Sequence, residues 1–204
     1  MIEVERKFLL TEEQQARLLD KAVFRSEKTY TDTYFDTENF TLMRQDLWLR
    51  QRGSVFELKI GQRHAADHLT TQYNELETEK EIRSFLHFPD AGTLSDILQE
   101  KSYFPFCTCT TTRRHYTRGS FGIDIDNAKY DDFSYSVAEI EVLVNDAALV
   151  DNAIYRITTF ADSCGLTNTY VRGKVVEYLW RKRRETYTML IAEGILHDPA
   201  GLKR

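Results

Sequence analysis

The sequence predicts a mainly β, α+β fold in which eight antiparallel strands form a sheet that curls or closes on itself, with helices at its periphery. Alternation of apolar and charged residues recurs in eight segments, as in strands that bury one face. Short turns join most of these segments, which is typical of antiparallel neighbours. Segments with helical features are interspersed among them.

Turn residues mark where the predicted strands end. Gly53-Ser54 is a tight two-residue turn, so the segments on either side of it form a hairpin, and Gly119 turns the chain between two later strands. The predicted strands are residues 2–8, 23–35, 47–52, 55–60, the segment carrying Glu75, Glu77 and Glu79, and residues 104–117, 121–126 and 136–143.

Caps and apolar spacing predict the helices. Thr11 and Gln14 form a capping-box pattern, and Thr93 is a cap that follows a break at Pro89. The predicted helices are a short one ending near Lys21, two between residues 80 and 101, one over about 146–163, and a largely helical segment from about 174 to 194. Residues 61–71 have no periodicity and are predicted to be a mobile loop.

Length and composition indicate one folded domain over residues 1–204. The chain has 42% hydrophobic and 12% aromatic residues, and no Pro/Gly/Ser linker divides it. No apolar run is long enough to span a membrane, and charges stand where a signal peptide would be apolar, so we expect a cytoplasmic protein without a membrane partner. The net charge of -5 argues against a nucleic-acid partner. We expect a monomer with reduced cysteines.

Charged side chains are sorted by sign among the predicted strands. Alternation places Glu3, Glu5 and Lys7 on one face of the first strand, where carboxylates could hold a hard cation and the lysine an anion. Other strands contribute further carboxylates (Asp124, Asp126, Glu139, Glu141) or cations (Arg50, Arg52, Lys59, Arg113). Segregation of this kind favours a binding site for a metal-bound phosphate over a solvated surface.

Periodicity alone does not say which face points inward. A barrel with an aliphatic interior and a charged exterior fits the same alternation. A charged interior would have to be filled by water, metal and polyanion, because unpaired buried charge costs several kcal/mol per ion.

Several separated motifs resemble the CYTH superfamily, the triphosphate tunnel metalloenzymes. Glu3-Val4-Glu5-Arg6-Lys7 is similar to the family's ExExK signature. The further motifs resemble the animal-type thiamine triphosphatase branch of that superfamily; they are residues 32–37, 47–52, 57–59, 123–126 and 139–141. The resemblance runs from residue 2 to about 180 and implies a closed tunnel of eight antiparallel strands with the charged faces inside.

The resemblance also implies roles for individual residues. The metal, Mg²⁺ or alternatively Mn²⁺, would be held by Glu3, Glu5, Asp124, Asp126, Glu139 and Glu141. The triphosphate would be held by Lys7, Arg50, Arg52, Lys59, Arg113 and Lys174. Arg114 replaces Arg113 in an alternative register. The family's acidic position is matched by Glu77, with Glu75 and Glu79 as alternatives. Trp48 is a candidate for stacking on the substrate's organic head, or else a core aromatic.

The implied reaction is Mg-dependent hydrolysis of the terminal phosphate of thiamine triphosphate, a small-molecule substrate, with Tyr34 and Lys59 as a catalytic dyad on that phosphate. Like charge around Lys59 should favour its neutral form, which predicts an alkaline rate optimum. The alternatives are an inorganic triphosphatase, a class IV adenylyl cyclase and a non-catalytic polyphosphate-binding module.

Overall fold

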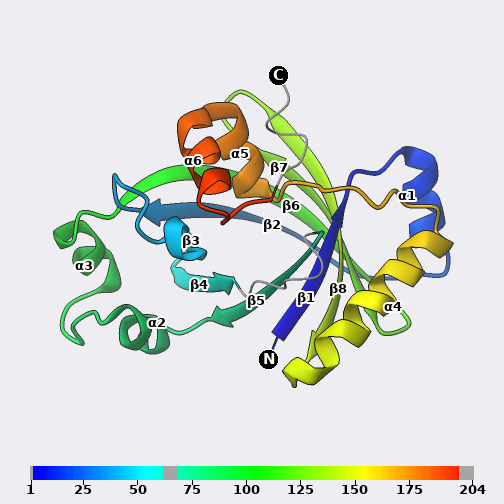
Figure 1. Ribbon diagram of the computed structural model, residues 1–204, viewed down its shortest axis with the longest axis horizontal. Coiled ribbons are helices and arrows are strands. Elements are labelled where there is room, and N and C mark those ends of the chain that lie inside the picture. The colour runs from blue at the N-terminus through cyan, green and yellow to red at the C-terminus, as the bar shows by residue number, and fades with distance from the viewer. Residues whose placement is uncertain (1, 62–68, 198–204) are drawn as a thin grey trace.

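Eight antiparallel strands close into a ring in the order β1-β5-β4-β3-β2-β6-β7-β8 (Figure 1). The computed structural model describes residues 2–61 and 69–197. The predicted fold class, a closed antiparallel barrel with peripheral helices, is confirmed. Residues 62–68, the centre of the predicted mobile loop, lie outside the described residues.

The strand boundaries follow the sequence pattern closely except at β5. The strands are β1 (Ile2–Phe8), β2 (Val23–Asp36), β3 (Leu47–Arg52), β4 (Val55–Gly61), β5 (Thr70–Leu76), β6 (Phe104–Arg118), β7 (Phe121–Lys129) and β8 (Ser134–Val144). β5 ends before Glu77 because the side chain of Thr78 accepts a hydrogen bond from the backbone N–H of Glu81 and caps the next helix. The predicted alternation through Glu79 therefore stops at Leu76.

Six α-helices surround the ring within the described ranges. They are α1 (Glu12–Leu19), α2 (Glu79–Leu86), α3 (Leu94–Glu100), α4 (Val150–Ser163), α5 (Lys174–Lys182) and α6 (Arg184–Ala192), with short 3₁₀ turns η1 (Met43–Gln45) and η2 (Ala147–Leu149). Both hydrogen bonds of the Thr11 capping box form, at 3.0 and 3.2 Å. None of these helices is both long and apolar enough to cross a bilayer.

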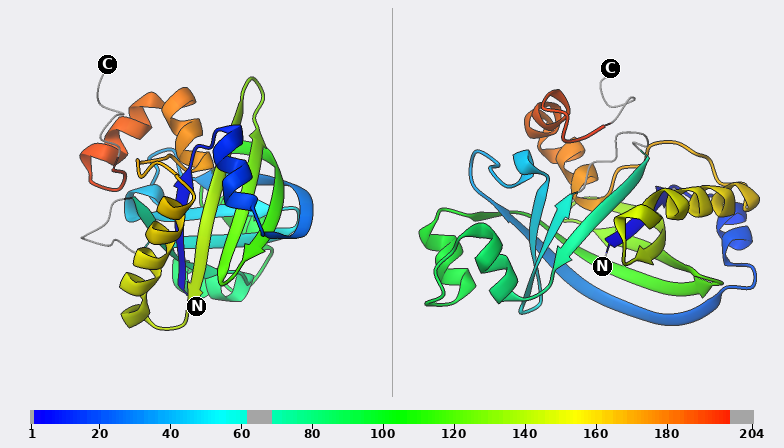
Figure 2. Two further views of the ribbon diagram at one scale, coloured as in Figure 1. Left: turned by 90° about the vertical axis from the view of Figure 1, so that its right-hand side faces the viewer. Right: turned by 60° about the horizontal axis from the view of Figure 1, so that its bottom comes forward.

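The aliphatic faces of the strands point outward, and helices cover them. Val4 and Ile140 pack with Ile157 of α4 on one side of the ring, while Leu58 packs with Ile82 of α2 on another. Figure 2 shows α4 and the α2/α3 pair at opposite ends of the sheet. Each fully buried side chain of this size contributes about 1.5–3 kcal/mol. The alternative of a charged exterior is thereby excluded, and the charged faces line the interior.

The two C-terminal helices pack against side chains of η1 and β3. Leu179 of α5 and Leu190 of α6 pack with Met43 and Trp48. The hydroxyl of Tyr130 donates a hydrogen bond of 2.7 Å to the backbone oxygen of Lys174, at the start of α5. This contact ties the start of α5 to the residue that follows β7, and the Lys174 side chain contacts Asp126 of that strand.

Candidate active site

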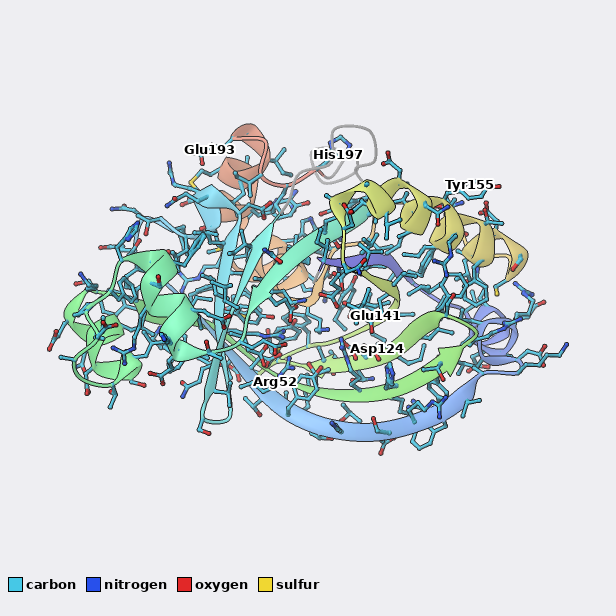
Figure 3. The ribbon with its side chains drawn as sticks, turned by 90° about the horizontal axis from the view of Figure 1, so that it is seen from below. Arg52, Asp124, Glu141, Tyr155, Glu193 and His197 are labelled. Carbon is cyan, nitrogen blue, oxygen red and sulfur yellow. The ribbon has the colours of Figure 1, made fainter. Side chains whose placement is uncertain are left out.

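Two cavities lie inside the ring and share Arg52 and Arg113 in their walls. The first has a volume of about 400 Å³ and extends from these arginines to residues 173–176, at the start of α5, and residues 194–197, which follow α6. The second has a volume of about 640 Å³ and is lined by Lys28, His115, Glu141 and their neighbours. Figure 3 shows Arg52, Asp124 and Glu141 within the space that the strands enclose.

Strand register places charges of opposite sign beside one another in this interior. Lys7 on β1 lies opposite Glu139 on β8, which in turn lies opposite Asp124 on β7. On the other flank of β7, Arg113 on β6 lies opposite Asp126. Side chains directly opposite in antiparallel strands share a face, so the alternation in each strand collects these groups in one channel.

Arg113 is the centre of the acidic half of the channel. Its guanidinium donates to Asp126 at 2.7 and 2.6 Å and to Glu139 at 2.7 Å, and it pairs with Asp124 at 2.5 Å. Lys174 also contacts Asp126 and lies 3.6 Å from Glu139. Arg113 is therefore the interior arginine. Arg114 faces outward, about half exposed.

The basic half of the channel contains two carboxylates that are not among the predicted site residues. Asp32, fully buried, accepts a bidentate pair from Arg52 at 2.7 and 2.9 Å. Glu57 accepts from Arg50 at 2.6 Å. Each acid is two residues from a predicted site residue on the same strand, Asp32 from Tyr34 and Glu57 from Lys59. This alternation places both acids on the inner face and could have identified them from the sequence. They hold the arginine forks in place.

Lys59 differs from the sequence expectation. Its ammonium lies 2.9 Å from Glu3 and contacts Glu75, which directly opposes it on β5. Burial lowers the pKa of Lys59, but Glu5, Glu3 and Glu75 together raise it well above its ordinary value despite the opposing charge of Arg50. The expected neutral lysine is therefore wrong for this arrangement: Lys59 is protonated.

The acid beside Lys59 is Glu75 and not Glu77. Glu75 lines the first cavity, and Lys59 lowers its pKa against the opposing effect of burial. Glu77 is exposed, beyond the end of β5, and does not line either cavity. The prediction that Glu77 contacts the substrate is therefore wrong. Glu75 occupies the position in the cavity that was expected for Glu77.

Tyr34 lines the same cavity as Lys59. Its side chain is 6% exposed, and burial raises the pKa of its hydroxyl although Arg50 lowers it. The hydroxyl is accordingly neutral and can donate a hydrogen bond into the cavity. The structure brings both predicted dyad residues to one cavity from β2 and β4.

Glu141 lies among carboxylates. Burial, the charges of Asp124 and Glu3 and a hydrogen bond to Glu3 raise its pKa to about 8, although Arg113 lowers it. Gly122 leaves room for this side chain, because a Cβ there would lie 2.7 Å from both Cγ and Oε1 of Glu141. A divalent cation would remove the electrostatic repulsion between carboxylates that lie this close together, and oxygen ligands suit Mg²⁺. Glu3, Asp124 and Glu141 thus fit a metal site.

Apart from Glu77, the predicted site residues lie inside the channel. The first cavity is lined by eleven of them: Glu3, Glu5, Lys7, Tyr34, Trp48, Arg50, Arg52, Lys59, Arg113, Glu139 and Lys174. Asp124 and Glu141 line the second, and Asp126 is fully buried against Arg113 and Lys174. His115 is an unpredicted member: it shares the inner face of β6 with Arg113 and lies 2.7 Å from Asp124.

Solved structures with low sequence identity share this fold. The PH1819 protein from Pyrococcus horikoshii OT3 matches with a TM-score of 0.63 at 15% identity, covering 88% of this chain and 99% of that chain. The putative adenylyl cyclase HpAC1 from Hippeastrum, described as having a dominant triphosphatase activity, matches with a TM-score of 0.55 at 15% identity, covering 89% and 95%. These likenesses concern the fold.

Curated relatives match at higher identity. The thiamine-triphosphatase of Homo sapiens is 31% identical over 211 residues, covering 94% of this chain and 90% of the human protein. That of Macaca fascicularis is 31% identical over 207 residues with the same coverage. The CYTH domain pattern matches residues 1–170, which include β1 to β8 and every interior charge described above except Lys174. The chain therefore belongs to the CYTH domain family.

Proposed function

We propose that this chain hydrolyses the terminal phosphate of thiamine triphosphate in a Mg²⁺-dependent reaction, releasing thiamine diphosphate and phosphate. Family membership and the thiamine-triphosphatase relatives make it a phosphohydrolase acting on small triphosphates. The single observation that carries the finer assignment is the first cavity, which joins a cation-rich channel to an apolar chamber containing Trp48.

The apolar chamber suits an aromatic heterocycle. Trp48 is 5% exposed and is held by a 3.0 Å hydrogen bond from its Nε1 to Oδ1 of Asp46. Val176, Ile195 and Leu196 belong to the same hydrophobic cluster as Trp48 and line the same cavity. A cationic ring stacked on an indole gains about 1–2 kcal/mol. Inorganic triphosphate has no group to place there.

The channel suits the triphosphate. Lys7, Arg50, Arg52, Lys59 and Arg113 line it and now contact carboxylates. Phosphate oxygens can take the place of those carboxylate oxygens, and planar guanidinium groups hold them bidentately. Cations from four strands, spread along one channel, match a chain of phosphoryl groups better than a single anion.

The reaction follows from the protonation states in the site. A water oxygen forms a bond to the terminal phosphorus, the bond from that phosphorus to the bridging oxygen breaks, and the diphosphate leaves. Both protons of the water stay with the released phosphate, as dihydrogen phosphate, which then exchanges protons with solvent. Lys59, protonated, and Tyr34, neutral, donate hydrogen bonds to the terminal phosphate as its charge shifts. Glu3, Asp124 and Glu141 would hold Mg²⁺, which when bound supplies charge neutralisation on phosphate oxygens.

Phosphate release from thiamine triphosphate, inorganic triphosphate and ATP, with and without Mg²⁺, tests the proposal. We expect hydrolysis of thiamine triphosphate with the highest kcat/KM, dependent on Mg²⁺ and reduced at least about 100-fold in Glu141→Gln. Equal kcat/KM for all three compounds would overturn the substrate assignment. Faster turnover of inorganic triphosphate would identify a tripolyphosphatase, and cyclic AMP with pyrophosphate from ATP would identify a cyclase.

A further inference from the structure

We propose that His115, Asp124 and Glu141 form an imidazole–carboxylate site for a divalent transition metal at the second cavity. One ligand atom from each residue can be chosen so that all lie within 4.8 Å of one another. Because Asp124 and Glu141 also belong to the carboxylates assigned above to Mg²⁺, the site deepens the proposed function and rests on it for any role in catalysis. Metal binding without substrate tests the site alone.

Register brings the three side chains together from neighbouring strands. His115 on β6 lies directly opposite Asp124 on β7, and Glu141 on β8 lies opposite Gly122, two residues from Asp124 on the same face. Ligand atoms bonded to one ion at about 2.1 Å lie about 3–4.2 Å apart. The observed span of up to 4.8 Å needs only side-chain adjustment, with no change in the sheet.

The two oxygens of Asp124 already have different partners. Oδ2 lies 2.5 Å from Arg113, whereas Oδ1 lies 2.7 Å from Nδ1 of His115. A metal ion bound between Nδ1 of His115 and Oδ1 of Asp124 would therefore leave the contact with Arg113 intact. The arginine also fixes the carboxylate plane, which keeps Oδ1 directed at the imidazole.

Gly122 makes space for the third ligand. A Cβ at this position would lie 2.7 Å from Glu141 Cγ, so any other residue would displace the Glu141 side chain. The backbone of Gly122 is outside the left-handed region, so its conformation does not require glycine. The space itself is what the glycine provides.

The imidazole determines which metal fits. Mg²⁺ prefers oxygen ligands, whereas imidazole nitrogen favours ions such as Co²⁺, Ni²⁺ and Zn²⁺. The second cavity, at about 640 Å³, is large enough to admit a hydrated ion to the three ligands. His115 should thus give this chain a preference for transition metals that a carboxylate-only site would lack.

Titration of the metal-stripped full-length protein with Co²⁺, followed by visible absorption and calorimetry, tests the proposal. We expect Co²⁺ to bind more tightly than Mg²⁺, and His115→Ala to weaken Co²⁺ binding at least about 10-fold while changing Mg²⁺ binding less than about 2-fold. The control is His87→Asn, on the exposed C-cap of α2, where asparagine tolerates the left-handed backbone and Co²⁺ binding should not change.

A second variant separates a ligand from a positioning residue. His115→Asn keeps a polar group that can donate to Asp124 but removes the imidazole. If His115 binds the metal, Asn should lose Co²⁺ affinity as Ala does, and the absorption band should shift. Unchanged Co²⁺ affinity and spectrum in either His115 variant, or wild-type Co²⁺ binding no tighter than Mg²⁺ binding, would overturn the proposal.

Discussion

Mg²⁺ binding should strengthen as the pH rises from 6.5 to 9, because the metal must displace a proton from Glu141. The pKa of this carboxyl is raised to about 8 by burial and by its acidic neighbours Asp124 and Glu3. At pH 7 about one-tenth of the molecules have Glu141 ionised, and at pH 9 about nine-tenths. The apparent Kd for Mg²⁺ should therefore be about 10-fold weaker at pH 7 than at pH 9.

The sign of the effect on stability is the reverse in the metal-free protein. A raised folded-state pKa contributes stability that is complete below the unfolded value, 4.5 for Glu141, and is lost as the pH rises through about 8. Saturating Mg²⁺ should restore that stability. The gain in Tm on adding Mg²⁺ should consequently be larger at pH 9 than at pH 7.

Calorimetry in buffers of different ionisation enthalpy measures both quantities. About 0.9 proton should be released per Mg²⁺ bound at pH 7 and about 0.1 at pH 9. Glu141→Gln should bind weakly with no pH dependence, whereas Glu38→Gln, an exposed loop carboxylate, should behave as wild type. A Kd that is constant over this range, or a pH dependence that survives in Glu141→Gln, would refute the reasoning.

Three further changes test separate parts of the site. Lys174→Met removes one cation from fully buried Asp126 and should lower the free energy of unfolding by about 2–4 kcal/mol in urea denaturation; an unchanged value would mean that Arg113 alone pairs Asp126. Glu75→Gln should change kcat/KM several-fold and Glu77→Gln should not; the opposite result would restore Glu77 to the site. Trp48→Leu should raise KM for thiamine triphosphate about 10-fold, and an equal rise for inorganic triphosphate would contradict stacking.

Alternation predicted which side chains share a face, because the period of a strand is fixed at two residues. It correctly grouped Glu3 with Glu5 and Arg50 with Arg52, and the sorting of charges pointed to an interior site. Orientation required the covering helices: Ile157 and Ile82 bury the aliphatic faces and leave the charged faces inside. That information is long-range and absent from any single strand.

Partner identity was less predictable, because it depends on register between distant strands. Lys59 looked crowded by arginines, yet β5 and β1 supply Glu75 and Glu3 and reverse the expected shift of its pKa. The alkaline dependence expected from Lys59 now rests on Glu141 instead. His115 was visible on the inner face of its strand, but only the pairing of β6 with β7 shows that it meets Asp124.

The cations of the channel are paired with carboxylates, so binding of a triphosphate must rearrange these pairs. Arg113 pairs with Asp124, Asp126 and Glu139, and Lys174 also contacts Asp126 and Glu139. A triphosphate that draws Arg113 away therefore leaves Asp124 without its arginine partner. A metal ion bound at Asp124 would supply positive charge where the arginine had been. Each ligand therefore supplies the charge that the other removes, and by linkage each must strengthen the other's binding by the same factor. The ion pairs that make the tunnel stable when empty are the same pairs that couple metal to substrate.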